Sequence, residues 1–181
     1  MNDFGSRPSG NILEVRGLKA YYMLRSAGGA GEVRAVDDIT MEVRRNEVYG
    51  IAGESSSGKT SLIKVLAAAT RPPLRVVSGT ARFRFGDRVV DVANAAADTI
   101  DAIRWKHLSY IMQGSMSVLN PVRRIGRTFE DFAARPLGLS GAAYRRRVID
   151  HLELLKLAPG VLDAYPHELS GGMRQRVTIG L

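Results

Sequence analysis

The sequence predicts a mixed α/β fold, and three observations support this prediction. Apolar and polar residues alternate over residues 12–43, which is typical of antiparallel strands. An almost wholly apolar run at 48–52 is followed by a glycine- and serine-rich loop and then by an alanine- and leucine-rich run at 61–69, which is the order strand, loop, helix. From residue 120 onward the apolar spacing becomes helical, so a helical segment is expected after the mixed part.

Length and composition fit one ordinary globular domain with a small insert at most. The chain has 181 residues, of which 45% are hydrophobic and 24% charged. No run approaches the roughly 18 apolar residues of a spanning helix, and the start of the chain lacks the residue order of a signal peptide. The absence of cysteine excludes disulfides, thiol catalysis and cysteine-ligated metals. A net charge of +8 suits an anionic partner, but it is spread along the chain and indicates nucleic acid only weakly.

An antiparallel sheet is expected in the N-terminal half, after a loose tail at residues 1–10. A flexible turn at 26–31 divides its strands, which are expected at residues 12–16, 19–24, 33–36 and 39–43. Asn46 lies in a tight turn at 45–47, because asparagine adopts positive φ more cheaply than most residues. Gly86 and Asp87 interrupt the alternation of residues 80–92, which predicts a hairpin.

The C-terminal half is expected to be mainly helical around a second buried strand. That strand is the short apolar segment at 108–112, which leads directly into Gln113. The helices are expected at residues 98–106, 128–135 and 141–157. Ser140 is the expected N-cap of the last helix, because a serine side chain accepts a hydrogen bond from an early helix N–H. The apolar face of that helix is expected to comprise Tyr144, Val148, Leu152 and Leu155.

Residues 53–60, with the sequence GESSSGKT, match the phosphate-binding loop pattern G-x-x-x-x-G-K-[ST] at every defined position. Gly53 and Gly58 permit backbone angles and close approaches that a Cβ would block. The successive N–H groups of such a loop, with the positive end of the following helix, bind phosphate oxygens. Lys59 would neutralise phosphate charge, and the Thr60 hydroxyl would ligate Mg²⁺. The alternative is a glycine-rich turn with a surface lysine, which would not require a strand before it and a helix after it.

A second motif, LSGGMRQR, occupies residues 169–176. On its own, Ser170 before two glycines and a helical run predicts only an N-capped helix start. Together with the phosphate-binding loop and a glutamine at a strand end, the motif resembles the signature sequence of the ATP-binding-cassette (ABC) ATPases. The resemblance extends from about Ile12 to Leu181, and the segments YPHELSGGMRQRV and VLNPV are most similar to the ATPase subunits of dipeptide and oligopeptide importers.

The resemblance implies a P-loop NTPase (RecA-like) α/β core with an N-terminal antiparallel β-subdomain and an inserted helical subdomain. It divides the chain into a flexible tail at 1–10, a nucleotide-binding core at 11–119, a helical subdomain at 120–168, and the signature motif with the start of its helix at 169–181. The family continues after the signature into further strands, and these cannot be placed here. The C-terminal part of the fold is therefore expected to be absent.

ATP and Mg²⁺ are the ligands that the resemblance implies. The nucleotide-binding residues carried over from the family are Tyr22, Gly53, Glu54, Ser55, Ser56, Ser57, Gly58, Lys59, Thr60 and Ser61. Tyr22 is expected to stack on adenine, since aromatic faces suit flat bases, and the alternative is that Tyr21 or Tyr22 only packs the sheet. Ser56 and Asn46 stand where many relatives carry glycine, and both are small and compatible with turns.

Gln113 resembles the Q-loop glutamine of the family, which reaches Mg²⁺ and the attacking water. The resemblance thus implies Lys59 and Gln113 as catalytic residues and Thr60 and Gln113 as Mg²⁺ ligands. A solvated glutamine at a strand end is the alternative. The family usually has an acidic residue and a proline next, whereas Gly114 and Ser115 follow here, which concerns the stiffness of the loop rather than the chemistry of the glutamine.

In this family the signature residues act on ATP that is bound by a partner subunit. The residues carried over are Leu169, Ser170, Gly171, Gly172, Met173, Arg174 and Gln175. The helix they start would direct its N–H groups at the γ-phosphate in the partner's loop. The implied partners are a second ABC ATPase subunit, identical or homologous, integral-membrane permease subunits, and indirectly a solute-binding protein. The expected location is the cytoplasm, at the inner face of the cell membrane through the permease, and no nucleic-acid partner is expected.

The function implied by the resemblance is that of an ATP-binding subunit of an ABC-type importer for peptides or similar small solutes. The family's Mg²⁺-binding aspartate, water-activating glutamate and switch histidine cannot be placed before Leu181, so this chain alone is expected to bind ATP and to hydrolyse it poorly or not at all. The alternatives are a truncated, non-catalytic nucleotide-binding remnant and a DNA-repair-type ABC ATPase. The 57 positions from Gln113 to Ser170 disfavour the latter, because they leave no room for a long coiled coil.

Overall fold

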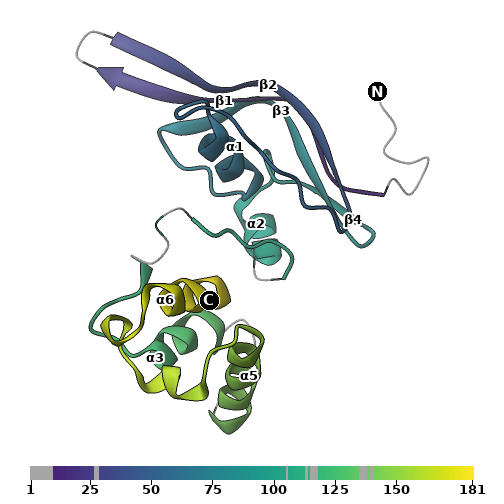
Figure 1. The fold of residues 1–181 in the computed structure, drawn as a ribbon. Helices are drawn as coiled ribbons and strands as arrows, with labels where there is room; N and C mark the ends of the chain where they lie inside the picture. Colours follow the sequence, from purple (N-terminus) through teal and green to yellow (C-terminus); the bar gives the residue numbers. More distant parts are fainter. Residues whose placement is uncertain are drawn as a thin grey trace. The chain divides into compact units, whose positions relative to one another are not determined.

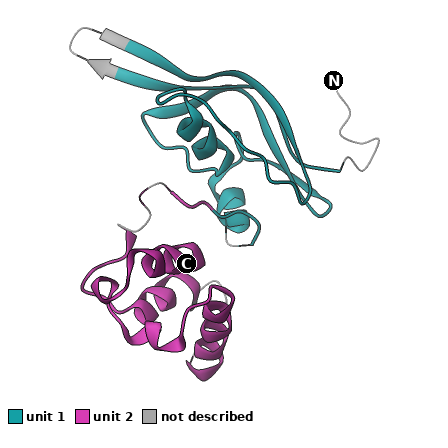
Figure 2. Cartoon of the chain, viewed as in Figure 1, with its two compact units in different colours: residues 1–109 teal, residues 110–181 magenta. Residues whose placement is uncertain are grey.

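A computed structural model of the chain describes residues 10–26, 29–104, 106–112, 114, 118–134, 138 and 141–181. It divides into two compact units, unit 1 (Met1–Ser109) and unit 2 (Tyr110–Leu181), drawn in different colours in Figure 2. Each unit has its own hydrophobic core. The boundary falls inside the segment 108–112, and the division at 119/120 stays a prediction. Gln113, Ser115 and Ser140 lie outside the described residues.

Unit 1 is built on a four-stranded antiparallel sheet with the strand order β2-β1-β3-β4 (Figure 1). The strands are β1 (Asn11–Ser26), β2 (Gly29–Arg44), β3 (Leu74–Phe85) and β4 (Arg88–Asp91). β1 and β2 pair from Asn11 opposite Arg44 to Ser26 opposite Gly29. The prediction of four short strands with a turn over 26–31 is therefore wrong. The interruptions at Gly17 and Asp38 are irregularities with positive φ (53° and 60°) within two continuous strands.

The two turns that the sequence predicts from residue type are confirmed. Asn46 adopts a φ of 62° after β2, and Gly86 adopts a φ of 61° between β3 and β4. Both residue types tolerate this left-handed conformation better than most. The hairpin is longer than expected, since β3 begins at Leu74 rather than at residue 80.

Two helices pack against the sheet residues of unit 1, α1 (Lys59–Leu66) and α2 (Ala97–Arg104). Leu62, Val65 and Leu66 of α1 join Val15 and Leu18 of β1 in the core. Burial of such side chains contributes about 1.5–3 kcal/mol each, which holds the phosphate-loop helix on the sheet. Both helices end earlier than the sequence predicts, at residue 66 instead of 69 and at residue 104 instead of 106.

The strands predicted at 48–52 and 108–112 are wrong for the described residues. Neither segment is in a strand, and both expose apolar side chains, with Val48 98% and Ile111 53% exposed. An apolar run becomes a buried strand only where neighbouring strands accept and donate its backbone hydrogen bonds. The described residues offer these segments no such neighbour, because all four described strands pair with one another in the antiparallel sheet.

Unit 2 is helical. It contains α3 (Ile125–Phe129), the π-helical turn η2 (Glu130–Ala134), α5 (Gly141–Leu154), the 3₁₀ turns η3 (Pro159–Asp163) and η4 (Pro166–Glu168), and α6 (Gly171–Gly180). The helix predicted at 128–135 starts three residues earlier and continues as η2. The predicted apolar face of α5 is confirmed for Tyr144, Val148 and Leu152, which are buried.

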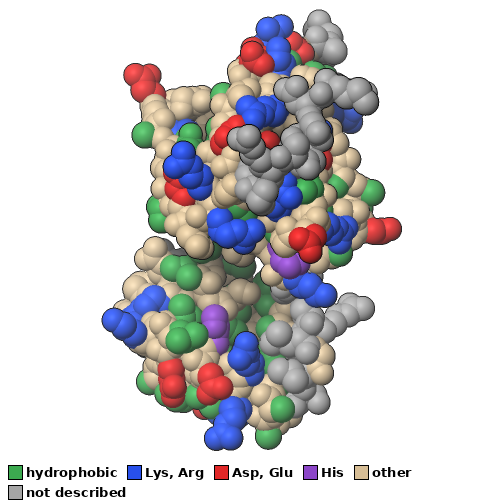
Figure 3. All heavy atoms as spheres, turned by 90° about the vertical axis from the view of Figure 1, so that its right-hand side faces the viewer, with side chains coloured by type: hydrophobic (Ala, Val, Ile, Leu, Met, Phe, Trp, Pro, Cys, Tyr) green, Lys and Arg blue, Asp and Glu red, His purple; other side chains and the backbone are tan. Residues whose placement is uncertain are grey.

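The surface of the described residues mixes charges of both signs. On the face drawn in Figure 3, Lys and Arg side chains are interspersed with Asp and Glu. Exposed ion pairs among the described residues include Arg123 with Asp131 at 2.7 Å and Arg127 with Glu130 at 2.6 Å. Such pairs contribute at most about 1 kcal/mol each. None of the described helices is both long and apolar enough to span a membrane.

Candidate nucleotide-binding site

The loop at residues 53–58 is exposed and enters α1 through Gly58. Gly58 has a φ of 89°, and a Cβ at this position would lie 1.9 Å from the carbonyl oxygen of Ala35 in β2. No side chain fits there. The loop can therefore pass the edge of the sheet only because residue 58 is glycine.

The Lys59 ammonium lies over this loop. Its Nζ donates to the carbonyl oxygen of Gly53 at 2.8 Å, to the hydroxyl of Ser57 at 3.1 Å, and to the carbonyl oxygen of Glu54. An ammonium has three N–H donors, so these three acceptors account for all of them. A compact positive charge is thus held at the loop, where it can neutralise an anion.

The backbone of the loop carries N–H groups that are free to donate. Ser57 N–H donates to Glu54 at 3.3 Å, whereas no described residue accepts from the N–H groups of residues 54–56 and 58–60. The last two of these begin α1, where the helix dipole adds partial positive charge. Thr60 also exposes its side chain here. Free N–H groups and one ammonium suit phosphate oxygens, and the hydroxyl oxygen of Thr60 can ligate Mg²⁺, so the residues fit both ligands.

Tyr22 is connected to the same helix. Its hydroxyl lies 3.0 Å from the hydroxyl of Ser61, which is buried in the first turn of α1. The ring is half-buried and packs against the core of unit 1. The structure therefore brings Tyr22, Ser61 and the loop together, and the stacking role of Tyr22 stays a prediction.

Tyr21 differs from Tyr22 in having its polar atom committed elsewhere. Its hydroxyl donates to the Asp37 carboxylate at 2.6 Å, and the Arg34 guanidinium lies 5.6 Å from the ring centroid. This hydrogen bond is the main reason why the pKa of Tyr21 is raised and the pKa of Asp37 is lowered. The Tyr21 hydroxyl is thus bonded within the β-sheet region, and Tyr22 is the tyrosine whose hydroxyl contacts α1.

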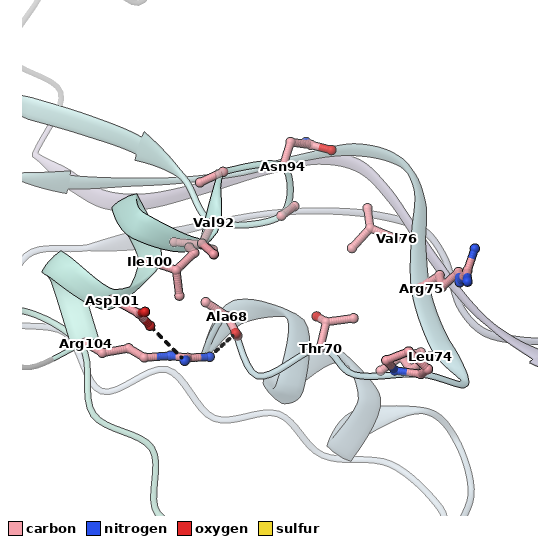
Figure 4. Close-up of a pocket in the computed structure, with 14 residues that line it drawn as sticks. Ala68, Thr70, Leu74, Arg75, Val76, Val92, Asn94, Ile100, Asp101 and Arg104 are labelled. Atoms are coloured by element: carbon pink, nitrogen blue, oxygen red, sulfur yellow. Dashed lines mark hydrogen bonds and ion pairs between the residues drawn. The ribbon is translucent and has the colours of Figure 1, made fainter.

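A cavity of about 530 Å³ lies at the other end of α1 (Figure 4). Its wall includes Ala68, Thr70, Leu74 and Asn94, and none of the predicted site residues that the structure describes lines it. At its edge Arg104 of α2 donates to the carbonyl oxygen of Ala68 at 2.6 Å and pairs with Asp101 at 3.4 Å. This guanidinium binds a carbonyl group just past the C-terminal end of α1 and so anchors the helix that carries Lys59.

The signature residues lie in unit 2 at the start of α6. Ser170 is the N-cap, as the sequence predicts, and its hydroxyl accepts a hydrogen bond from the N–H of Met173 at 3.3 Å. Leu169 before the cap and Val177 inside the helix are buried and fix α6 to the core. Gly171 and Gly172 are exposed, and apart from their chain neighbours and the backbone of α6 itself no described atom lies within 4 Å of a Cβ built at either position.

The segment that leads into this cap is held by polar contacts. The Glu168 carboxylate accepts from the N–H of Tyr165 at 2.6 Å, which closes a capping box. The Arg124 guanidinium lies 5.5 Å from the centroid of the Tyr165 ring, and its interaction with this tyrosine is the main cause of its raised pKa. These contacts hold residues 165–168, which lie just before Leu169 and Ser170.

Arg176 is a residue of this region to which the sequence assigned no role. Its guanidinium reaches the carbonyl oxygens of Leu155 and Lys156, beyond the end of α5. The only signal in the sequence is its position four residues after Gly172, which places the two on one face of α6. The tertiary contact itself has no counterpart in the sequence pattern.

The antiparallel sheet, the helix with its Lys59 loop and the helical unit are consistent with a fragment of the α/β P-loop ATPase fold. The ABC transporter family profile matches residues 36–181, and the chain belongs to this family. Two solved structures share the fold at low sequence identity. A bacterial ABC transporter cassette solved as a dimer has a TM-score of 0.70 at 20% identity over 93% of this chain and 67% of its own. The cbiO1 protein from Clostridium perfringens has a TM-score of 0.66 at 21% identity, and the match covers 95% of this chain and 61% of that protein.

The curated relatives include ATP-binding proteins named for dipeptide and oligopeptide transport. The dipeptide transport ATP-binding protein DppD of Caldanaerobacter subterraneus subsp. tengcongensis is 31% identical over 94% of this chain and 50% of its own length. The oligopeptide transport ATP-binding protein OppD of Salmonella typhimurium is 32% identical over 97% of this chain and 50% of its own length. The chain thus spans about half the length of the curated relatives it matches.

Proposed function

We propose that this chain is the nucleotide-binding part of an ATP-binding subunit of an ABC-type importer, which uses ATP to drive the transport of peptides or similar small solutes. The observation that carries the proposal is the Lys59 loop, in which one ammonium and a row of free N–H groups lie at the start of α1. The solute class rests on the names of the relatives, which are dipeptide and oligopeptide transport proteins.

The chemistry that we assign to this site is phosphate binding and charge neutralisation. The N–H groups of residues 54–56 and 58–60 would bind phosphate oxygens, and Lys59 would neutralise the β- and γ-phosphates. Thr60 and Gln113 would ligate Mg²⁺, which supplies further positive charge to the transferring phosphoryl group when bound. Tyr22 would stack on adenine, and Gln113 would orient the attacking water.

The signature residues 169–175 would act on ATP in the loop of a second ATPase subunit. Open space at Gly171 and Gly172 supports this assignment, because nothing in the described chain requires glycine at these positions. A phosphate from another chain could approach the exposed N–H groups there without meeting a side chain. Permease subunits, and through them a solute-binding protein, would complete the assembly, with this subunit at the cytoplasmic face of the membrane.

We assign no residue as the base that activates the attacking water. Gln113 would orient this water, and residues 53–61 offer ligands for phosphate and metal, but none of them is assigned to accept its proton. We therefore expect the isolated 181-residue polypeptide to bind ATP and to hydrolyse it poorly or not at all.

Titration of the full chain with a fluorescent ATP analogue and Mg²⁺ tests the proposal, with phosphate release followed in the same samples. Lys59→Ala should weaken binding by about tenfold or more, which corresponds to ~1.4 kcal/mol. Lys64→Ala, which removes a lysine from the last turn of the same helix, should leave binding unchanged. Equal binding by the two variants would refute the assignment of the loop, and phosphate release that depends on Lys59 would refute the expected lack of hydrolysis.

A further inference from the structure

The side chain of Arg176 connects the signature helix α6 to the end of α5. Its Nη1 donates to the carbonyl oxygens of Leu155 at 3.2 Å and Lys156 at 2.8 Å. Its Nε donates to the carbonyl oxygen of Gly172 at 3.3 Å, one turn earlier on α6. A single planar guanidinium thus bonds the first turn of α6 and the chain just beyond α5.

This contact has a clear electrostatic reason. The last carbonyl groups of a helix have no partner within the helix and carry partial negative charge. Lys156 adopts a φ of 55°, and the N–H of Leu157 donates to the carbonyl oxygen of Leu152 at 3.0 Å. The chain therefore leaves the helical path of α5 at this point. Arginine suits the site because its donors form a rigid fork, whereas a lysine ammonium is one point charge.

A second attachment joins the other end of α6 to α5. His151 Nε2 lies 3.1 Å from the carbonyl oxygen of Gly180. Gly180 and Leu155 are also in close contact, since a Cβ on Gly180 would lie 2.4 Å from Leu155 Cδ1. Because α6 is attached to α5 near both its ends, its direction as well as its position is fixed.

The direction of α6 decides where its free N–H groups point. Ser170 accepts from the N–H groups of Met173 and Arg174, through its hydroxyl and its carbonyl oxygen. No described residue accepts a hydrogen bond from the N–H groups of Gly171 and Gly172, and both residues are exposed at the start of α6. A small rotation of α6 would turn these two donors away from any group that they are meant to bind.

We propose that Arg176 is a positioning residue of the signature motif, which sets the direction of the Gly171 and Gly172 N–H groups without touching the nucleotide. The inference rests on the proposed function, because it assigns how α6 is presented to ATP in the loop of a second copy or a homologous subunit. Loss of the guanidinium frees the first turn of α6, while the chain's own Lys59 loop, in unit 1, is unchanged.

The test measures ATP-driven association of two copies of the full chain by sedimentation velocity with Mg²⁺, alongside nucleotide affinity and thermal unfolding. Arg176→Ala should weaken association about tenfold, as expected for loss of hydrogen bonds from a charged group, with nucleotide affinity unchanged. Arg176→Lys should recover the melting temperature but not association, because a point charge near the end of α5 cannot bond both helices. Arg146→Ala, which removes an exposed arginine of α5, is the matched control and should resemble the unaltered chain.

A mixing experiment adds a second readout. Arg176→Ala retains an intact loop and Lys59→Ala retains an intact signature, so a mixed pair contains one complete site. The mixture should therefore associate with ATP more strongly than either variant alone. A merely structural role of Arg176 would lower association and melting temperature in parallel, with Arg176→Lys restoring both.

The outcomes separate the inference from the proposed function. Unchanged association of Arg176→Ala, or association that simply follows thermal stability across the variants, overturns the positioning role. If the unaltered chain binds ATP through Lys59 but does not associate, the action of α6 on a second copy fails while nucleotide binding stands. If it neither binds ATP nor associates, the proposed function itself fails.

Discussion

The two helix starts at α1 and α6 contain the same residue type but place it in opposite surroundings. At α1, Gly58 is wedged against β2, and a Cβ would overlap the carbonyl oxygen of Ala35. At α6, Gly171 and Gly172 face open space. Glycine at 58 is thus required by the chain's own packing, whereas no contact among the described residues requires glycine at 171 or 172.

The two helix starts also differ in charge. The α1 loop holds the Lys59 ammonium against its own carbonyl groups, so it carries a full positive charge. The first turn of α6 offers only the cap of Ser170 and the free N–H groups of two glycines. The first start can neutralise a phosphate by itself, and the second can only add the partial charge of a helix end. This difference fits our proposal that the start of α6 in one subunit completes the phosphate site at the α1 loop of another.

The largest expected effect of breaking this contrast is that of Gly58→Ala. The substitution places a Cβ in the left-handed region and against Ala35, so we expect unit 1 to lose at least about 3 kcal/mol of stability and nucleotide binding to disappear. Chemical denaturation and ATP-analogue titration measure the two effects. Gly171→Ala is the matched comparison and should fold as well as the unaltered chain. Equal damage by both substitutions would contradict the contrast.

Ser170→Ala is expected to have the next largest effect. Loss of the hydroxyl that accepts from Met173 should cost about 1 kcal/mol of the stability of unit 2, as for other N-caps. Ser170→Asp keeps an N-cap acceptor, so it should restore stability, but its negative charge should repel a phosphate and weaken ATP-driven association. Thermal unfolding and sedimentation distinguish the two effects. Restoration of both properties by aspartate would argue against a phosphate at this helix end.

The part of the site that sequence could predict is the part that depends on local chemistry. The loop match at residues 53–60, the cap at Ser170 and the turn at Asn46 each follow from the residue types themselves. The antiparallel hairpins were predicted as well, although the alternation broke at Gly17 and Asp38, where the structure has irregularities rather than ends. A bulge and a strand end interrupt the pattern in the same way.

The part that could not be predicted depends on contacts between distant residues. Apolar runs at 48–52 and 108–112 indicate strands, but a strand forms only beside a partner, and none is present among the described residues. The clash that makes Gly58 obligatory comes from Ala35, 23 positions earlier. The contacts of Arg176 with Leu155 and Lys156 likewise cross from one helix to another, and no local spacing signals them.

Gly172→Ala tests the open side of the contrast. Alanine is the better helix former, and no described atom outside α6 lies near its Cβ, so α6 should gain about 0.5–1 kcal/mol of stability. The same methyl group would stand where a phosphate of a second subunit should approach, so ATP-driven association should fall. Gly160→Ala, at another open position in η3, should leave association unchanged. A Gly172→Ala chain that is more stable and associates normally would show that glycine is not needed for an approach from outside.

Ser56→Gly should have the smallest effect and sharpens the contrast from the α1 side. Ser56 holds a φ of 64° in the loop, a conformation that costs an L-residue about 1–2 kcal/mol. Glycine removes this cost but adds freedom to the unfolded chain, so the net gain should be no more than about 0.5 kcal/mol. Ser55→Gly is the matched control, because Ser55 is not among the positive-φ residues, and it should lose stability instead. Chemical denaturation measures the change in the free energy of unfolding for both variants. Changes of opposite sign would place stored backbone strain at Ser56. Equal losses of stability would mean that the loop bears no strain at this residue and that its shape is set by Gly58 alone.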